Sequence, residues 1–253
     1  MKTIILTGGT GLIGKALTIN LLKQGNKVVI TSRVPQKKKF IFENKLEDFE
    51  DSFEVLELDY FKKSAIPSFV DNLIQLKIFP DAIIHNARSL ETLKIEKNGE
   101  SSDENLSGEY KVGVIGPYIL NNAILSSSIG NKLKNIIIIS SIYGVVGPTI
   151  SLYEDFKFES PIQYGITKAA QIHLSKELAI RYADADIRVN TISYGGVEGR
   201  ANEKFKKRYS NLTPLKAMLN LNEVIKPIDF LLSDGASGMT GHNLIIDKGW
   251  TLW

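Results

Sequence analysis

A tyrosine and a lysine four residues apart, Tyr164 and Lys168, are the side chains of this sequence best suited to proton transfer. At that spacing both lie on one face of a helix. A tyrosine hydroxyl titrates near pH ~10, and an adjacent ammonium group favours its ionised form and brings proton exchange closer to neutral pH. The spacing occurs by chance on many surface helices, so its meaning depends on the elements around it.

Short apolar runs alternate with helix-like segments along the whole chain. We expect strands near residues 4–6, 28–30, 53–58, 82–84, 136–139, 188–192 and 244–246. Between them we expect helices at about 12–22, 42–51, 66–76, 110–128, 161–182 and 223–232, and loops at 35–40, 88–108 and 194–220, the last with mixed helical segments. Continuous apolar strands are typical of a parallel sheet covered on both faces. Because no linker or internal repeat is visible, the sequence predicts one doubly wound α/β domain spanning residues 1–253.

Three glycines, Gly8, Gly11 and Gly14, directly follow the first expected strand and precede a helix. Glycines at such a turn permit positive φ and a close approach of the backbone to a pyrophosphate, and the helix N-terminus attracts phosphate. In this position the triplet indicates a nucleotide site. The alternative is a glycine-rich turn without a ligand.

The end of the second expected strand indicates which dinucleotide would bind. A carboxylate there would accept from a ribose 2′-hydroxyl, whereas a cation would pair with a 2′-phosphate. The sequence has Ser32 and Arg33 at this point, with no acid and three lysines shortly beyond. We therefore expect NADP(H) in preference to NAD(H), although Arg33 is also explained as a solvated strand-end residue. Asp59, after the third strand, is placed to contact the adenine amine or to cap the following helix.

Composition excludes several other classes of protein. The 253 residues include 31 basic and 28 acidic side chains, for a net charge of +3, which is too balanced to favour nucleic acid or an anionic membrane as partner. No cysteine is present, and His85, His173 and His242 show no metal-ligand spacing, so we expect no metal. No apolar run approaches the ~20 residues of a membrane span, and no signal peptide is recognisable, so a cytoplasmic protein is expected.

With Asn86-Ala87 and Ser141 at two further strand ends, the ordered motifs resemble those of the short-chain dehydrogenase/reductase family. The resemblance covers essentially the whole chain and includes its ending, Asp247-Lys248-Gly249-Trp250. It implies a Rossmann fold with a seven-stranded sheet, an NAD(P)(H) cofactor, and hydride transfer between the nicotinamide C4 and a carbonyl or carbinol carbon.

The resemblance also implies a role for each matching residue. Tyr164 would be the acid in reduction and the base in oxidation, Lys168 would lower its pKa and bind the nicotinamide ribose, and Ser141 would hydrogen-bond the substrate oxygen. Ser140 is the lesser candidate for this last role. Motifs and resemblance together give the expected cofactor contacts: Gly8, Thr10, Gly11, Ile13, Gly14, Ser32, Arg33, Asp59, Asn86, Ala87, Lys168 and Val197.

Four features depart from the family pattern. The glycine spacing is more typical of the extended branch of the family, Arg88 replaces a glycine near the cofactor mouth, and Tyr194 stands where proline is customary. Gly113 stands where many members carry an asparagine that holds a relay water, which puts a proton path through Lys168 in question. A non-catalytic dinucleotide-sensing homologue therefore remains an alternative to an enzyme.

The separation of Ser141 from Tyr164, 23 residues, is longer than is usual in the family. We expect the extra segment, residues 148–161, to lie over or beside the substrate pocket, where its polar and aromatic side chains would suit a hydroxyl-rich ligand. An oligomer contact or a surface elaboration explains it equally well. The alternative substrate is a 3-oxoacyl chain or a general carbonyl compound, because this scaffold hosts many activities.

A narrower resemblance involves residues 140–146, Tyr153-Glu154 and the ending 249–251. These segments resemble a bacterial subgroup associated with flagellin modification and nonulosonic-acid sugar pathways, which implies a sugar or nucleotide-sugar substrate. Basic residues of the segment 197–220 could draw in an anionic substrate, although a solvated helix face is the more ordinary interpretation: Arg200, Lys204, Lys206, Lys207 and Arg208. The family resemblance further implies a homodimer or homotetramer built through the helices at 110–128 and 161–182.

Overall fold

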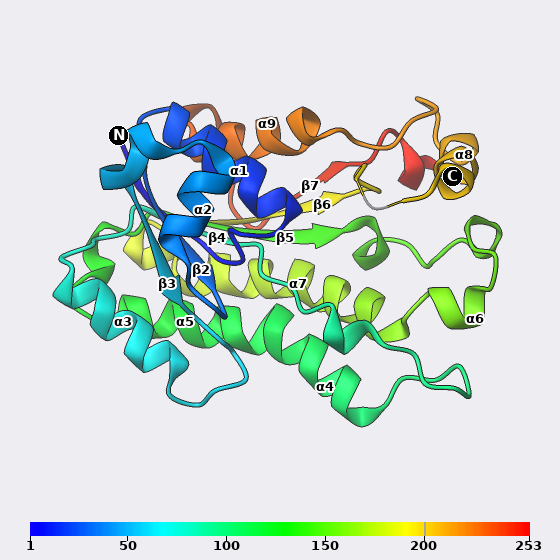
Figure 1. The fold of residues 1–253 in the computed structure, drawn as a ribbon, viewed down its shortest axis with the longest axis horizontal. Helices are drawn as coiled ribbons and strands as arrows, with labels where there is room; N and C mark the ends of the chain where they lie inside the picture. The colour runs from blue at the N-terminus through cyan, green and yellow to red at the C-terminus, as the bar shows by residue number, and fades with distance from the viewer. Residues whose placement is uncertain (200) are drawn as a thin grey trace.

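A sheet of seven parallel strands forms the centre of the molecule, in the order β3-β2-β1-β4-β5-β6-β7 (Figure 1). The computed structural model describes residues 1–199 and 201–253. Its strands are β1 (Thr3–Leu6), β2 (Lys27–Ser32), β3 (Phe53–Glu57), β4 (Ala82–His85), β5 (Asn135–Ser141), β6 (Arg188–Tyr194) and β7 (Asn243–Ile246). Each expected strand is present, and the prediction of a doubly wound Rossmann fold is confirmed.

Helices cover both faces of the sheet, as continuous apolar strands require. On one face lie α1 (Leu12–Lys23), α2 (Lys37–Asn44) and α9 (Leu221–Leu232), and on the other α3 (Ala65–Gln75), α5 (Gly116–Leu125) and α7 (Ile162–Arg181) (Figure 1). Successive strand residues face opposite layers: Ile4 and Leu6 belong to the first core and Ile5 to the second. All three are fully buried.

The segment after β2 differs from the prediction of a basic loop followed by a helix at 42–51. Helix α2 begins at Lys37 and ends at Asn44, and residues Glu47–Ser52 form a 3₁₀ helix. Lysines are unfavourable in a first helical turn. Burial of Phe40 and Ile41 in the core outweighs this effect, because each buried side chain of this size contributes about 1.5–3 kcal/mol.

The helix predicted for residues 110–128 begins earlier and has a break. Helix α4 spans Asp103–Tyr110, a π turn covers Lys111–Ile115, and α5 continues in line with them (Figure 1). The Ser102 side chain accepts from the backbone N–H of Asn105, and Asp103 and Glu104 follow in the first turn. This is a regular helix start. Part of the loop predicted for 88–108 is therefore helical.

Beyond the carboxyl ends of the strands, short elements gather at one end of the sheet: α6 (Phe156–Glu159) and α8 (Glu203–Asn211) (Figure 1). The remaining 3₁₀ turns are Glu91–Leu93, Gly130–Lys132, Ile142–Gly144, Ile150–Leu152, Ala183–Ala185, Asp234–Ala236 and Trp250–Leu252. Arg200 lies outside the described residues. Among the helices that the structure describes, none combines the length and apolar character needed to cross a membrane.

Candidate active site

A cavity of about 1070 Å³ lies at the carboxyl ends of the strands. Ligand pockets usually measure about 300–1,000 Å³, so this one has room for a large ligand. The expected site residues from all parts of the chain line it together: Gly8, Thr10, Gly11, Ile13, Gly14, Ser32, Arg33, Asp59, Asn86, Ala87, Ser141, Tyr164, Lys168 and Val197. The parallel topology explains this convergence, because it brings all strand ends to one edge of the sheet.

The glycine turn after β1 is tightly packed. Gly8 has φ +65°, and a β-carbon at this position would come 2.8 Å from the Cα of Ala87. A β-carbon at Gly14 would come 2.2 Å from the carbonyl oxygen of Gly8. Gly11 begins α1 without a side-chain cap, and no acidic residue occupies the first turn. The helix therefore presents N–H groups and its positive end to the cavity, the arrangement that binds phosphate groups.

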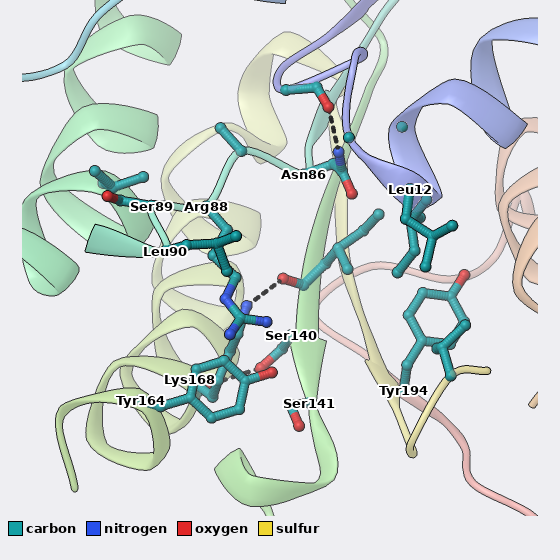
Figure 2. Close-up of a pocket in the computed structure, with 18 of the residues that line it drawn as sticks. Leu12, Asn86, Arg88, Ser89, Leu90, Ser140, Ser141, Tyr164, Lys168 and Tyr194 are labelled. Atoms are coloured by element: carbon teal, nitrogen blue, oxygen red, sulfur yellow. Dashed lines mark hydrogen bonds between the residues drawn. The ribbon is translucent and has the colours of Figure 1, made fainter. Parts of the chain in front are cut away.

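Thr7 joins the glycine turn to the end of β4. Its hydroxyl accepts from the backbone N–H groups of Asn86 and Ala87, both at 3.0 Å. The Asn86 amide in turn donates to the carbonyl oxygen of Thr7 at 3.1 Å. It also donates to the carbonyl oxygen of Gly8 at 3.0 Å (Figure 2). Thr7 was not recognised from the sequence, although a threonine directly before the first glycine of such a turn is a usable signal. These bonds hold two walls of the cavity together.

At the far end of the cavity, Arg33 forms a two-pronged ion pair with Glu91, at 3.1 and 3.2 Å. Hydrogen bonding from Arg33 holds the pKa of Glu91 below its ordinary value. Glu91 was not recognised from the sequence, and it offers Arg33 a carboxylate that competes with any anionic ligand. Two neighbours also close local turns: Asp59 accepts from the N–H of Phe61 at 3.0 Å, and Ser32 donates to the carbonyl oxygen of Val34 at 3.0 Å.

Tyr164, Lys168 and Ser141 converge where β5 meets α7 (Figure 2). The Lys168 ammonium nitrogen is 5.5 Å from the centre of the Tyr164 ring. Ser141 ends β5, and its Oγ accepts from the N–H of Tyr143 at 3.3 Å. Ser140 donates instead to the carbonyl oxygen of Lys168 at 2.8 Å, so its hydroxyl ties β5 to the helix. This contact agrees with the lesser rank given to Ser140.

Lys168 is buried, and burial lowers its pKa to about 8. Glu109 opposes this effect and Arg88 adds to it. The Arg88 guanidinium carbon lies 4.8 Å from the centre of the Tyr164 ring, so the arginine at the position usual for glycine covers one side of this tyrosine (Figure 2). A cation held over an aromatic face is attracted by the ring's negative potential.

The segment between Ser141 and Tyr164 lines the cavity through Leu152, Tyr153, Glu154 and Glu159. It is held there by aromatic contacts and by hydrogen bonds. The Tyr153 hydroxyl bonds that of Tyr143 at 2.5 Å, and its ring packs edge-on against Phe205 of α8. The expectation that this segment lies at the pocket is confirmed.

Two of the basic residues of the following segment are paired with neighbouring acids. Arg208 donates to Glu154 at 3.0 Å and to the Leu152 carbonyl oxygen at 2.7 Å, and Lys206 pairs with Glu203. Lys204 and Lys207 are exposed. Arg200 lies outside the described residues. These contacts favour the solvated helix face over a funnel for anions.

Two further residues singled out in the sequence have structural contacts. Tyr194 is buried, and its hydroxyl donates to the carbonyl oxygen of Val224 at 2.5 Å, joining β6 to α9. Its ring stands across the cavity from the tyrosine–lysine pair, next to Leu12 (Figure 2). His85 is buried and bonds Asn121 at 2.9 Å. Within residues 1–199 and 201–253, no cluster of three or more His, Asp or Glu side chains could hold a metal ion.

Comparison with known proteins agrees with this geometry. The family model described as enoyl-(acyl carrier protein) reductase matches residues 11–251. The chain is 28% identical to post-translational flagellin modification protein A of Campylobacter coli, over 99% of this chain and 98% of that protein. It is 27% identical to glucose 1-dehydrogenase 2 of Bacillus subtilis, over 100% and 95% of the two chains.

The fold is also similar to that of a solved structure. A short-chain dehydrogenase from Leptospira borgpetersenii with bound NAD+ aligns with a TM-score of 0.85 and 28% identity, covering 99% of this chain and 92% of that one. The flagellin-modification relative is consistent with the subgroup that the sequence motifs suggested. The chain belongs to the short-chain dehydrogenase/reductase family of oxidoreductases.

Proposed function

We propose that this chain is an NADP(H)-preferring oxidoreductase that interconverts a carbonyl and a secondary alcohol of a sugar or nucleotide sugar. The observation that carries the proposal is the meeting of Ser141, Tyr164 and Lys168 in the same cavity as the glycine turn. A bound nicotinamide dinucleotide would supply or accept the hydride. The side chains of this protein would then handle the proton and the charge on the substrate oxygen.

Tyr164 is the proposed proton donor in reduction and acceptor in oxidation. It is half-buried at the cavity wall, and the buried Lys168 ammonium lies 5.5 Å from its ring centre. Ser141 lies in the same wall and would hydrogen-bond the substrate oxygen as charge develops on it. Lys168 has three N–H groups and uses two within the protein, which leaves one for a cofactor ribose.

The cofactor would extend from this pair to the glycine turn. Gly8, Gly11 and Gly14 give the pyrophosphate a close approach to the N-terminus of α1, and Asn86 and Ala87 border the path between. Arg33 supports NADP(H), because its guanidinium lies at the adenosine end and the β2 end carries no acid. Glu91 would compete with the 2′-phosphate for this guanidinium.

A sugar-like substrate is supported by the wall opposite the cofactor path. Tyr143, Tyr153 and Glu154 offer hydroxyl and carboxylate groups beside aromatic faces, a combination suited to a ligand with many hydroxyl groups. The similarity to a glucose dehydrogenase points the same way. A 3-oxoacyl or general carbonyl reductase is the second candidate, favoured by the description of the family model.

Turnover of NADPH and NADH with a panel of sugars, nucleotide sugars, ketones and 3-oxoacyl thioesters tests these proposals. Tyr164→Phe should abolish turnover and leave cofactor affinity nearly unchanged, because it removes only the hydroxyl. A variant that retains most of the activity would refute the role of Tyr164. Dinucleotide binding without hydride transfer at high protein concentration would instead identify a sensor.

We also propose the homodimer or homotetramer that the family resemblance implies. Large apolar side chains are exposed on the two helices concerned, with Tyr118 and Ile119 on α5 and Ile166 and Ile180 on α7. Where such side chains form a contiguous patch, they often mark a protein interface. Light scattering gives the molar mass, and a mass of about 28.1 kDa would contradict the proposal.

A further inference from the structure

The Lys168 ammonium is held by two acceptors inside the protein. It donates to the carbonyl oxygen of Ile139 at 3.0 Å and to the side-chain oxygen of Gln171 at 2.9 Å. Lys168 and Gln171 are 7% and 3% exposed, so water cannot freely replace either bond. A buried ammonium keeps its charge only where such partners are present.

The other end of the Gln171 amide is also committed. Its nitrogen donates to the carbonyl oxygen of Gly113 at 2.9 Å. A carbonyl can only accept and an ammonium can only donate, so the two neighbours determine which way the amide faces. Gln171 therefore links the lysine to the π turn in one orientation.

The π turn is shaped to make this link. The residue four positions after Gly113 is Pro117, which has no backbone N–H to donate to the Gly113 carbonyl, and this oxygen accepts from Gln171 instead. A β-carbon at Gly113 would come 2.4 Å from the Thr167 methyl carbon and 3.3 Å from the Gln171 amide nitrogen. The absence of a side chain at this position is what lets α7 and its glutamine approach.

Charged groups face Lys168 from three elements. Tyr164 lies one turn earlier on α7, and Arg88 approaches from the loop after β4. Glu109, on α4, lies four residues before Gly113 and is buried, and Thr92 donates to its carboxylate at 2.5 Å. Glu109 favours the charged lysine and Arg88 opposes it. The effects of Glu109 and Arg88 on the lysine charge therefore oppose each other. Gln171, in contrast, contacts the ammonium directly through a hydrogen bond.

We propose that Gln171 is a positioning residue for Lys168, which holds the ammonium charged and aimed at Tyr164 by anchoring it to the Gly113 carbonyl. The inference rests on the proposed roles of Tyr164 and Lys168. Removing the amide leaves one protein acceptor for a buried cation, so the neutral lysine gains in population. Tyr164 then loses the neighbouring positive charge on which its proposed proton transfer depends.

Lysine-labelled NMR tests the link without a substrate. The signal of Lys168, assigned by its loss in Lys168→Met, is titrated in wild type, Gln171→Leu and Gln171→Glu. Leucine fills a similar space without an acceptor, so the midpoint should fall by about one pH unit, a tenfold change in proton affinity. Glutamate adds a negative charge, so the midpoint should rise. If Gln171→Leu fails to fold, the rise in Gln171→Glu still decides the question.

Gln163→Leu is the matched control. Gln163 is also buried on α7, two turns earlier, and its amide donates to the carbonyl oxygens of Thr92 and Lys94 instead of contacting the lysine. Its loss should lower stability without moving the Lys168 titration. An unchanged midpoint in both Gln171 variants, or an equal shift in Gln163→Leu, would overturn the proposal.

Turnover distinguishes this proposal from the proposed function. With any substrate that the panel identifies, the alkaline limb of the reduction rate should move towards acid in Gln171→Leu and towards alkali in Gln171→Glu, with no movement in Gln163→Leu. NMR shifts in the expected directions together with no turnover in wild type would leave the lysine anchor standing and refute the enzyme. Turnover in wild type without the NMR shifts would support the enzyme and refute the lysine anchor.

Discussion

Replacing Gly113 by alanine tests the close approach between the π turn and α7. The added β-carbon would come 2.4 Å from the Thr167 methyl carbon, well inside the ~3.5–4.0 Å separation of carbon atoms in contact. Thr167 is 2% exposed, and a β-branched side chain is stiff in a helix, so it cannot easily turn away. Overpacking costs about 1–3 kcal/mol, and the better helix propensity of alanine offsets up to about 1 kcal/mol. We expect Gly113→Ala to lower the free energy of unfolding by about 1–2 kcal/mol.

A double-mutant cycle assigns this loss to the contact. Thr167→Ser removes the methyl group that the alanine would strike, at a cost of about 1 kcal/mol for the lost burial. The double variant Gly113→Ala/Thr167→Ser should therefore lose about 1–2 kcal/mol less unfolding free energy than the two single variants lose together. Urea unfolding of the four proteins measures the coupling, with equal m-values as the check on the reference state. Additivity within about 0.5 kcal/mol would refute the reasoning.

Three further predictions concern the Arg33–Glu91 pair and the buried His85. Arg33→Ala should weaken NADPH binding about tenfold or more with little change for NADH, since only NADPH carries the 2′-phosphate. Glu91→Gln should tighten NADPH binding, because it removes the carboxylate that pairs with the Arg33 guanidinium. Fluorescence titration measures both, and equal changes for NADH would contradict them. Burial lowers the pKa of His85 from 6.5 to about 4, so its contribution to stability is present above pH 6.5 and is lost as the pH falls towards 4, by about 2–3 kcal/mol at pH 4.5. Between pH 7 and pH 4.5, the His85→Gln protein should therefore lose less unfolding free energy than wild type, by this amount. The exposed His173→Gln is the control and should behave like wild type. Equal losses in all three proteins would refute the prediction.

Local patterns in the sequence were sufficient for the sheet and for the outline of the site. Strands such as residues 136–139 are continuous apolar runs. A short run of this kind is typical of a strand in a parallel sheet whose two faces are both buried. The parallel topology then places all strand ends at one edge, so residues far apart in sequence, from Gly8 to Val197, were expected to share one cavity.

Helix boundaries were less predictable where burial opposes local preference. The three lysines that begin α2 disfavour a helix N-terminus, and contacts of Phe40 and Ile41 with the core decide its position. The π turn at residues 111–115 likewise has no periodic signal in the sequence. Its contact with α7, through the hydrogen bond from Gln171 to the Gly113 carbonyl, joins two elements far apart in the chain.

The fold class, the edge of the sheet that carries the cavity, and the residue types able to transfer a proton could all be read from the amino-acid order. How those residues are held became visible only in the folded molecule: Gln171 lies between Lys168 and Gly113, and Glu91 pairs with Arg33. The physical reason is that strand and helix periodicity is written in neighbouring residues. A hydrogen bond between residues 58 positions apart depends instead on how two elements pack, and no local pattern records it.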